Sequence, residues 1–184
     1  MDPLSPFSTA DPTAMRWIRP SPGESAYELR AGDSLLARMS WKGAGGSLAH
    51  ITLADGECTA KRGGFLQPHV TLRDAAGRDV ARLTMHLTHG TLEVAGGRSY
   101  SFRRAGLLVP AWQISEPGGR PIVHVEPVAE RNHLQGGLVQ VDPALAKNPA
   151  LPWLVVLAWY FIHRAWFEDE TLRASESILS AATG

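Results

Sequence analysis

The sequence predicts a mainly β protein, in which an antiparallel sheet of about a dozen strands curls around the last helix of the chain. Between residues 15 and 142, apolar and polar residues alternate, and glycine-containing turns separate the alternating runs. Residues 151–162 are apolar on every side. A helix without a polar face must be covered by protein or by lipid, and a sheet with one apolar face supplies such a cover.

Length and composition fit one domain with few special features. A chain of 184 residues, 44% of them hydrophobic, is most simply a single domain with a sizeable core. Its 18 basic and 18 acidic residues cancel, which argues against nucleic acid as the main partner, because such domains are usually basic. The single cysteine, Cys58, has no activating context, so we interpret it as a strand residue and not as a nucleophile.

We expect residues 1–14 to form a flexible amino-terminal arm. This segment contains Pro3, Pro6 and Pro12 and few bulky side chains. It lacks the basic stretch followed by an apolar stretch that marks a secretory signal. We therefore expect a cytoplasmic protein, with peripheral attachment to a membrane as a further option.

The strands are predicted from residues that alternate with a period of two. Leu35, Ala37, Met39 and Trp41 fall on one face of a strand, with Arg38 on the other. Successive side chains of a strand point to opposite faces, so we expect the first face to be buried. The same alternation recurs in the runs 49–53, 70–73, 99–103 and 112–115.

Short turns connect these strands and reveal a repeat. Glycine, which tolerates the positive φ of a tight turn, recurs between the runs, in segments 31–33, 54–57, 75–78, 95–98 and 117–120. One strand-turn-strand unit occurs three times, at residues 27–39, 70–83 and 112–125. We interpret this as an internally repetitive antiparallel barrel.

A central helix is predicted at about residues 150–166 and completes a domain over residues 15–167. Pro149 or Pro152 can occupy its first turn, where the missing N–H of proline costs nothing. At ~1.5 Å per residue this helix is ~22 Å long. Residues 168–184 are acidic at first and then small and polar, and we expect them to be a poorly ordered or loosely docked tail.

Two environments can cover the apolar run. A membrane span needs about 20 mostly apolar residues, and extending this run to residue 167 brings in His163 and Arg164. A helix is ~10–12 Å across with its side chains, and a can of strands around a central helix is an established fold. We favour a helix inside the barrel, and the alternative is a tail anchor that spans a membrane with residues 151–167.

The order of these elements resembles the tubby-like barrel superfamily, which includes tubby carboxyl-terminal domains, phospholipid scramblases and plant LURP-one-related proteins. The resemblance covers about residues 15–166 and is closest to small bacterial members of unassigned function. It is carried by the three repeated units, the terminal apolar helix, and the runs 61–65 and 97–104. It implies a twelve-stranded closed barrel around a hydrophobic carboxyl-terminal helix.

The function that the resemblance implies is recognition of lipid. Tubby domains bind phosphoinositides at the membrane surface, whereas scramblases are associated with lipid movement and carry a calcium-binding segment. The chain has no acidic loop with carboxylates at calcium spacing, so we do not expect scramblase activity. Fold analogy alone is a weak guide to function.

Two basic pairs, Lys61–Arg62 and Arg103–Arg104, are the candidate binding residues. Each pair lies near the end of an expected strand, close to Phe65 in one case and to Leu107–Leu108 in the other. Surface cations can meet anionic headgroups while neighbouring apolar residues enter the membrane. The alternative is ordinary solubilising charge on the outer wall of the barrel.

The remaining polar residues suggest neither a metal site nor an enzyme. His86 and His89, three residues apart on one strand, would point to opposite faces. His124 and Glu126 share a face, with His133 as a third candidate, but we interpret all of them as solvent-facing. We find no nucleophile-elbow motif and expect no metal or cofactor. The resulting hypothesis is a non-enzymatic binding module for anionic lipid headgroups, phosphoinositides among them, or for an acidic protein partner.

Overall fold

The computed structural model describes residues 2–182 except 22, 44–45, 65–67, 87–88, 107–110 and 131–132, and it describes side chains as far as Glu168. Over these residues the chain forms twelve strands, two short 3-10 helices and one α-helix. In chain order they are η1 (Phe7–Thr9), β1 (Met15–Ile18), β2 (Ala26–Ala31), β3 (Ser34–Trp41), β4 (Leu48–Leu53), β5 (Gly56–Gly63), β6 (His69–Asp74), β7 (Asp79–His86), β8 (His89–Val94), β9 (Arg98–Ala105), β10 (Ala111–Ser115), β11 (Pro121–Glu130), β12 (His133–Val141), η2 (Pro143–Leu145) and α1 (Leu151–Ala182).

These strands form one closed antiparallel barrel. Each strand pairs with its neighbours in the chain, and β1 pairs with β12 to close the sheet, for example through Met15 opposite Val139. A closed sheet has no unpaired edge. The predicted fold class, a mainly β barrel with a carboxyl-terminal helix, is confirmed, and the architecture is consistent with a tubby-like fold.

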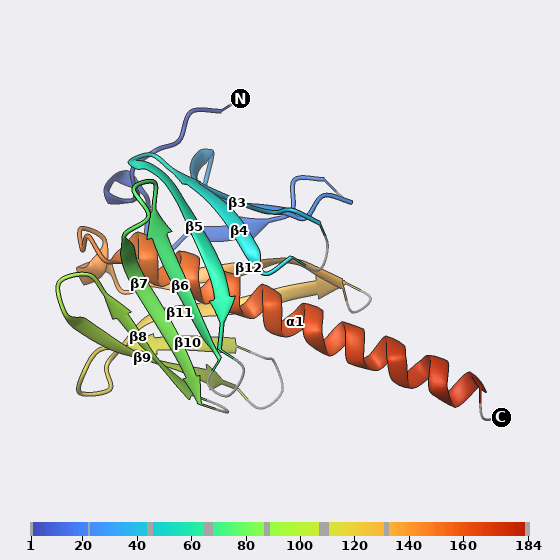
Figure 1. Cartoon of the computed structure of the whole chain (residues 1–184). Coiled ribbons are helices and arrows are strands. Elements are labelled where there is room, and N and C mark those ends of the chain that lie inside the picture. Colours follow the sequence, from blue (N-terminus) through green and yellow to red (C-terminus); the bar gives the residue numbers. More distant parts are fainter. Residues whose placement is uncertain are drawn as a thin grey trace.

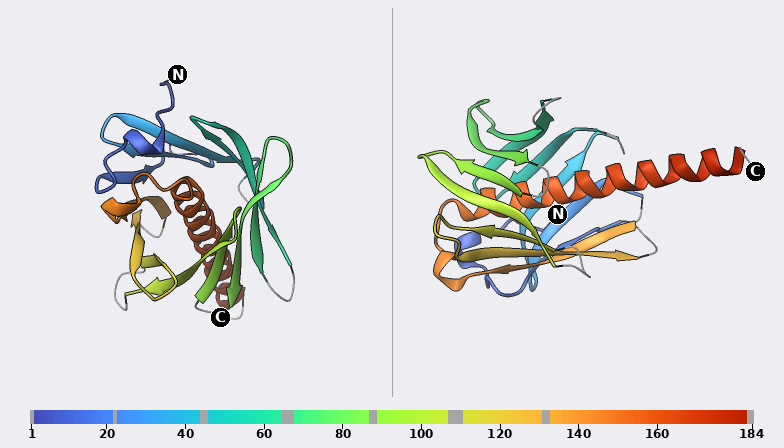
Figure 2. Two further views of the ribbon diagram at one scale, coloured as in Figure 1. Left: turned by 90° about the vertical axis from the view of Figure 1, so that its left-hand side faces the viewer. Right: turned by 90° about the horizontal axis from the view of Figure 1, so that it is seen from below.

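The first half of α1 fills the interior of the barrel. Figure 2 shows the strands surrounding the helix, and every side chain of residues 154–160 is completely buried. Trp159 stacks on Trp17 of β1, with ring centroids 5.4 Å apart and planes 9° apart, and Tyr27 of β2 meets Trp159 edge-on at 5.2 Å. Burial of each large side chain contributes about 1.5–3 kcal/mol, so the helix stabilises the barrel by filling the centre of a core that the inward strand residues surround.

The helix begins where proline permits a start. Pro152 occupies the second position of α1, in the first turn, where its missing N–H leaves no hydrogen bond unmade. The Asn148 side-chain oxygen accepts a hydrogen bond from the N–H of Ala150 at 2.9 Å, and the N–H of Leu151 donates to the Asn148 carbonyl at 3.0 Å. These contacts satisfy backbone groups at the start of the helix.

The helix is longer than the sequence predicted. It ends at Ala182 and not near residue 166, and its second half projects beyond the strands (Figure 1). After Pro152 the chain has no proline or glycine before Gly184, so nothing in the sequence interrupts the backbone hydrogen bonds. Helix α1 therefore extends through the expected tail as far as Ala182, and the expectation that residues 168–184 are poorly ordered or loosely docked stays a prediction. No helix in the described part of the chain combines the length and apolarity that crossing a membrane requires.

The amino-terminal segment packs on the barrel and is not a free arm. Phe7 in η1 is 7% exposed and belongs to the core. The N–H of Ser5 donates to the Leu35 carbonyl at 2.7 Å, and Asp2 pairs with Arg30 at 2.9 Å. The expectation of a flexible arm did not take into account that burial of Phe7, the single aromatic side chain of this segment, is favourable. The three prolines restrict the backbone, which lowers the entropy lost on docking.

The three repeated units of the sequence are three similar hairpins. They are β2–β3, β6–β7 and β10–β11, so one begins at every fourth strand of the barrel. Each hairpin has a register shift near its turn, located after Leu29, after Leu72 and after Ile114. A β-bulge increases the local twist and bends a strand. The repeated sequence unit therefore corresponds to a repeated hairpin of the barrel, with a register shift near its turn in all three copies.

The first of these bulges alters which leucine enters the core. Leu29 pairs with Ala37, but Arg30 pairs with Leu35, so Leu36 is the extra residue. Leu36 joins the core cluster, whereas Leu35 is buried outside it, where Leu4 forms an isolated bridge with it. Leu35 is buried, as the alternation predicted, but it does not share a core cluster with Ala37, Met39 and Trp41, and the bulge is the reason.

Shortening the chain tests whether the helix holds the barrel together. A protein ending at residue 149 loses the filling of its interior and is expected to aggregate or to lose cooperative unfolding, because domains are stable by only about 5–15 kcal/mol. A protein ending at Glu168 keeps every residue of α1 that is buried among the described side chains and should unfold cooperatively in urea, as we expect of the full chain. A well-folded, soluble 1–149 protein would contradict this account.

Gly136 of β12 provides a second, local test of the packing. A Cβ atom at this position would lie 2.2 Å from the carbonyl oxygen of Trp17 on β1. Because the neighbour is backbone, Gly136→Ala should destabilise the protein by about 1–3 kcal/mol or more. The control is Gln140→Ala, at an exposed position of the same strand, which should change the unfolding free energy by less than about 0.5 kcal/mol. Urea titration of both variants measures the difference.

Candidate functional site

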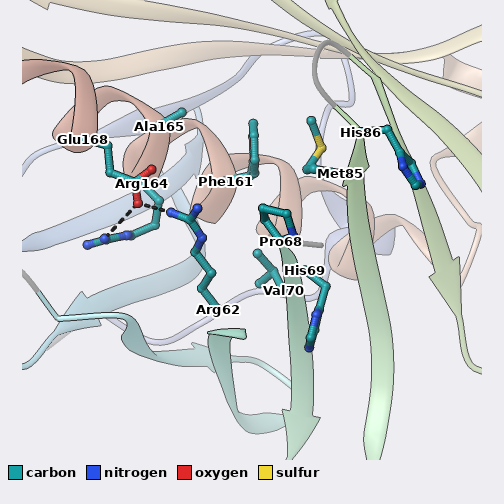
Figure 3. Close-up of a pocket in the computed structure, with 10 residues that line it drawn as sticks. All are labelled: Arg62, Pro68, His69, Val70, Met85, His86, Phe161, Arg164, Ala165 and Glu168. Carbon is teal, nitrogen blue, oxygen red and sulfur yellow. Dashed lines mark hydrogen bonds and ion pairs between the residues drawn. The ribbon is translucent and has the colours of Figure 1, made fainter. Parts of the chain in front are cut away.

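Helix α1 leaves the barrel through one end, which we call the exit mouth. The end of β5, the start of β6 and the end of β7 lie at this mouth. A cavity of about 550 Å³ opens there between these strands and α1 (Figure 3). It is lined by Arg62, Pro68, His69, Val70, Met85, His86, Phe161, Arg164, Ala165 and Glu168. Its volume is in the range of small-molecule sites.

Two arginines meet one carboxylate at the rim of this cavity. Arg62 of β5 and Arg164 of α1 both donate to the same oxygen, Oε1 of Glu168, and the Arg164 contact measures 3.1 Å. Figure 3 shows the three side chains converging. Two guanidinium groups that share one carboxylate oxygen can bind another anionic oxygen in the same way, so the cluster can accept another anion in place of Glu168.

The strand period places Arg62 in the mouth. Ala60 and Cys58, which are two and four positions earlier on β5, are buried in the barrel, so Arg62 follows the inward alternation. The Arg62 N–H donates to the Tyr160 hydroxyl at 3.1 Å, and this hydroxyl donates to the Ser47 carbonyl. Burial raises the pKa of the Tyr160 hydroxyl. These bonds fix the backbone that carries Arg62.

The helical period places the other members of the cluster. Tyr160, Arg164 and Glu168 are four residues apart and therefore lie on one face of α1. Arg164 is largely buried, with 12% of its side chain exposed, and it also donates to the Gly46 carbonyl at 3.3 Å. Glu168 is 40% exposed. Arg164 is thus held by the protein on more than one side, and Glu168 is the more accessible partner.

The floor of the cavity is apolar. Val70 and Met85 are 2% and 7% exposed, and Phe161 extends from α1 toward the same space (Figure 3). Phe161 packs edge-on against Phe102 at 5.5 Å and against Trp112 at 5.1 Å. Aromatic contacts of this kind orient a ring beyond what area burial does. The cavity therefore combines a rigid apolar floor with a cationic rim.

The structure separates the members of the two basic pairs that the sequence singled out. Lys61 is exposed on the outer wall, and its neighbour Arg62 points into the mouth. Arg103 and Arg104 are both exposed at the end of β9, with Arg104 on the same side of the strand as buried Phe102. Strands β6, β7 and β8 lie between the pairs, which puts them roughly 19 Å apart along the wall at about 4.8 Å per strand. Phe65 and Leu107–Leu108, their apolar neighbours, lie outside the described residues.

Several histidines gather at the exit mouth. His69 and His86 line the cavity. His86 and His89 are direct partners across the β7–β8 hairpin, with stacked rings 5.7 Å apart. The prediction that these two point to opposite faces was wrong, because they belong to two different strands, and paired residues of adjacent strands share a face. His124 lies in the middle of β11, opposite Gln140.

The described residues contain neither a metal-binding cluster nor a reactive thiol. Among them, no three histidine, cysteine or acidic side chains are placed to hold one ion. Cys58 is buried in β5, where burial and, to a lesser extent, Asp74 raise the pKa of its thiol to about 12. A thiol with this pKa is not a nucleophile at neutral pH. The interpretation of Cys58 as a strand residue is confirmed.

Sequence reasoning identified one member of the arginine cluster and missed two. Arg62 belonged to a predicted pair, but Arg164 was considered only as a charge within a possible membrane span, and Glu168 was assigned to a tail. The four-residue spacing of Arg164 and Glu168 is the signal that predicts a contact on one helix face. No local signal could have predicted that Arg62 joins them, because 106 residues separate it from Glu168.

Comparison of the chain with protein-family models, with curated proteins and with solved structures finds no match. The candidate site therefore rests on the geometry of the chain itself.

His163 is a second polar group of α1 near the mouth, and it is held in an aromatic environment. Its ring stacks on Trp41, with centroids 4.0 Å apart, and meets Tyr27 edge-on at 5.4 Å. Burial, together with the nearby charges of Arg164 and Arg19, lowers the pKa of His163 from 6.5 to about 4. The imidazole is therefore neutral at pH 7.

Acidification should weaken the fold through His163. The unfolded chain binds a proton to this residue near pH 6.5, whereas the folded chain does so only near pH 4. Stability is therefore lost as pH falls through this interval, by roughly 3 kcal/mol in total, and the loss levels off below it.

The check is urea unfolding between pH 7.5 and about 4. His163→Phe should remove this component of the pH dependence, whereas His50→Gln, at an exposed position on β4, should keep it. Equal pH profiles for wild type and His163→Phe would contradict the assigned environment.

Proposed function

We propose that the protein is a non-enzymatic binding module that recognises an anionic lipid at the exit mouth of the barrel. The observation that carries this proposal is the convergence of Arg62 and Arg164 on one carboxylate above an apolar floor. A site for an amphiphile needs these two parts in contact with each other. The interior is filled, and the cavity at the exit mouth is a place where a ligand can contact both α1 and the strands.

The cationic rim suits an oxygen anion. Guanidinium groups match carboxylate and phosphate oxygens through directed N–H donors, and they keep their charge at any physiological pH. Arg164 is the stronger candidate for this contact, because charged hydrogen bonds gain strength away from solvent and only 12% of its side chain is exposed. Arg62, with 34% of its side chain exposed, is the outer member of the pair.

The apolar floor favours a lipid over an acidic protein partner. Val70, Met85 and Phe161 lie beside the two arginines in one cavity. Val70 and Met85 are already buried, so an acyl chain or glycerol backbone would cover mainly the half-buried Pro68, Phe161 and Ala165, at about 25 cal/mol per Å² of apolar area. A purely acidic peptide would pair with the arginines but would leave this apolar surface in contact with water.

The other cations of the mouth and wall support approach to a membrane. Lys61, Arg103 and Arg104 are exposed, and each cation near an anionic leaflet contributes about 1 kcal/mol of attraction. We assign these three residues to attraction at a distance, and Arg62 and Arg164 to recognition. The tubby-like resemblance adds support, because tubby domains bind phosphoinositides at membranes. Membership of that superfamily is part of this proposal.

Vesicle cosedimentation tests the proposal with a matched pair of variants. Lys61 and Arg62 are adjacent on β5, but only Arg62 points into the mouth. Arg62→Gln should weaken binding to vesicles of phosphatidylcholine with phosphatidylglycerol by about tenfold, because it removes a charged hydrogen bond. Lys61→Gln removes the same charge from the wall and should weaken binding less than about threefold at 0.15 M salt.

Three outcomes would contradict this function. The wild type could bind pure phosphatidylcholine as well as the anionic vesicles, or bind neither. The two variants could also lose affinity equally, which would indicate attraction by net charge alone. Binding of polyglutamate in preference to vesicles, with the same dependence on Arg62, would replace the lipid by an acidic partner.

A further inference from the structure

We infer that the Glu168 carboxylate occupies the position of the ligand's anionic group, so that the carboxyl-terminal helix carries a built-in competitor for its own binding site. This inference rests on the proposed function and goes further, because it names the residue that a ligand must displace. It also implies that binding of the ligand releases a contact between the mouth and α1, just before the half of the helix that projects from the barrel.

The first support is the way in which the cluster is bonded. A single oxygen of Glu168 accepts from both Arg62 and Arg164, and both arginines line the same cavity as the apolar floor. An external carboxylate or phosphate oxygen placed there would receive the same two donors. Glu168 therefore marks where an anionic group is bound between these two guanidiniums.

The second support is an asymmetry in what holds each partner. Arg164 also donates to the Gly46 carbonyl, and its guanidinium lies 5.5 Å from the centre of the Phe167 ring. The backbone of Arg62 is bonded to Tyr160 and belongs to the β5 ladders. Glu168 is 40% exposed and lies at the rim of the cavity (Figure 3). If Glu168 moved away, Arg164 would keep its other contacts and Arg62 would stay anchored at its backbone.

The third support is the energetic balance of the exchange. Partly exposed ion pairs contribute little net free energy, so replacing one carboxylate by another changes the rim only slightly. A ligand with an apolar chain also covers the half-buried Pro68, Phe161 and Ala165 of the cavity, which Glu168 does not do. The chemistry that displaces Glu168 is therefore an anionic oxygen attached to an apolar chain, and a small anion such as acetate lacks the second part.

Titration of Glu168→Gln with decanoate and with acetate tests this inference. The glutamine keeps the size of the side chain but not its charge, so decanoate should bind the variant about tenfold more tightly than it binds wild type, within the usual range of couplings between sites. The control is Glu93→Gln, which removes the same charge from an exposed position on β8 and should bind as wild type does. Acetate should bind none of the three proteins at the concentrations used for decanoate. Anionic vesicles are titrated in the same way, because they present an anionic oxygen and an apolar chain within a membrane.

Two further measurements separate competition from a general change in charge. In an Arg62→Gln background, Glu168→Gln should produce a smaller gain, because one of the two shared donors is gone. Amide hydrogen exchange in residues 169–182 should rise when decanoate is added to wild type, since the tie between the helix and the mouth is released. In Glu168→Gln, exchange should already be high and should not respond.

The possible results distinguish this inference from the proposed function. If neither wild type nor Glu168→Gln binds decanoate or anionic vesicles, both are wrong. If wild type binds but Glu168→Gln binds equally or more weakly, only the competitor role is overturned. Equal gains from Glu168→Gln and Glu93→Gln would also overturn it, whereas binding that emerges only in Glu168→Gln would support both.

Discussion

The side chains of α1 between Leu151 and Ile162 occupy the space that water would otherwise fill inside the barrel. The inward faces of the strands are apolar and too far apart to pack against one another across the barrel, so they need a rod of this width between them. The contact is specific as well as apolar. Trp159 stacks on Trp17, and β12 carries glycine at positions 136 and 137, where a Cβ would collide with the Trp17 carbonyl and the Trp159 ring respectively. Wall and helix therefore determine each other's position.

Filling the interior moves any binding site to the ends of the barrel. At the end where α1 begins, the amino-terminal segment docks through Phe7, which lines a surface depression together with Pro149 and Trp153. At the other end the helix passes out between the strands and leaves the cavity beside Phe161. The two ends thus differ because one is covered by the chain's own start and the other is crossed by a helix narrower than the mouth. This asymmetry directs the proposed ligand to the exit mouth.

The period of a strand also explains why neighbouring charges have different roles. Lys61 and Arg62 are adjacent in sequence but point to opposite sides of β5, so one faces solvent and the other faces Glu168. Two basic residues that are adjacent on a strand therefore do not form one continuous basic surface. The functional pairing is between Arg62 and Arg164, which belong to different elements, and Tyr160 connects them because its hydroxyl bonds the Arg62 backbone one helical turn before Arg164.

The sequence by itself determined the strands, the apolar helix, the barrel class and the threefold hairpin repeat, because each depends on residues close together in the chain: alternation, turn glycines and an uninterrupted apolar run. It did not predict the docking of Phe7, the bulge that brings Leu36 and not Leu35 into the core cluster, or the length of α1 beyond the barrel. Only the tertiary structure decided which charges meet. The pairing of β5 with β6 and the depth at which α1 enters the barrel bring Arg62 to Arg164 and Glu168, and such long-range contacts depend on the packing of the whole barrel and leave no mark in local sequence.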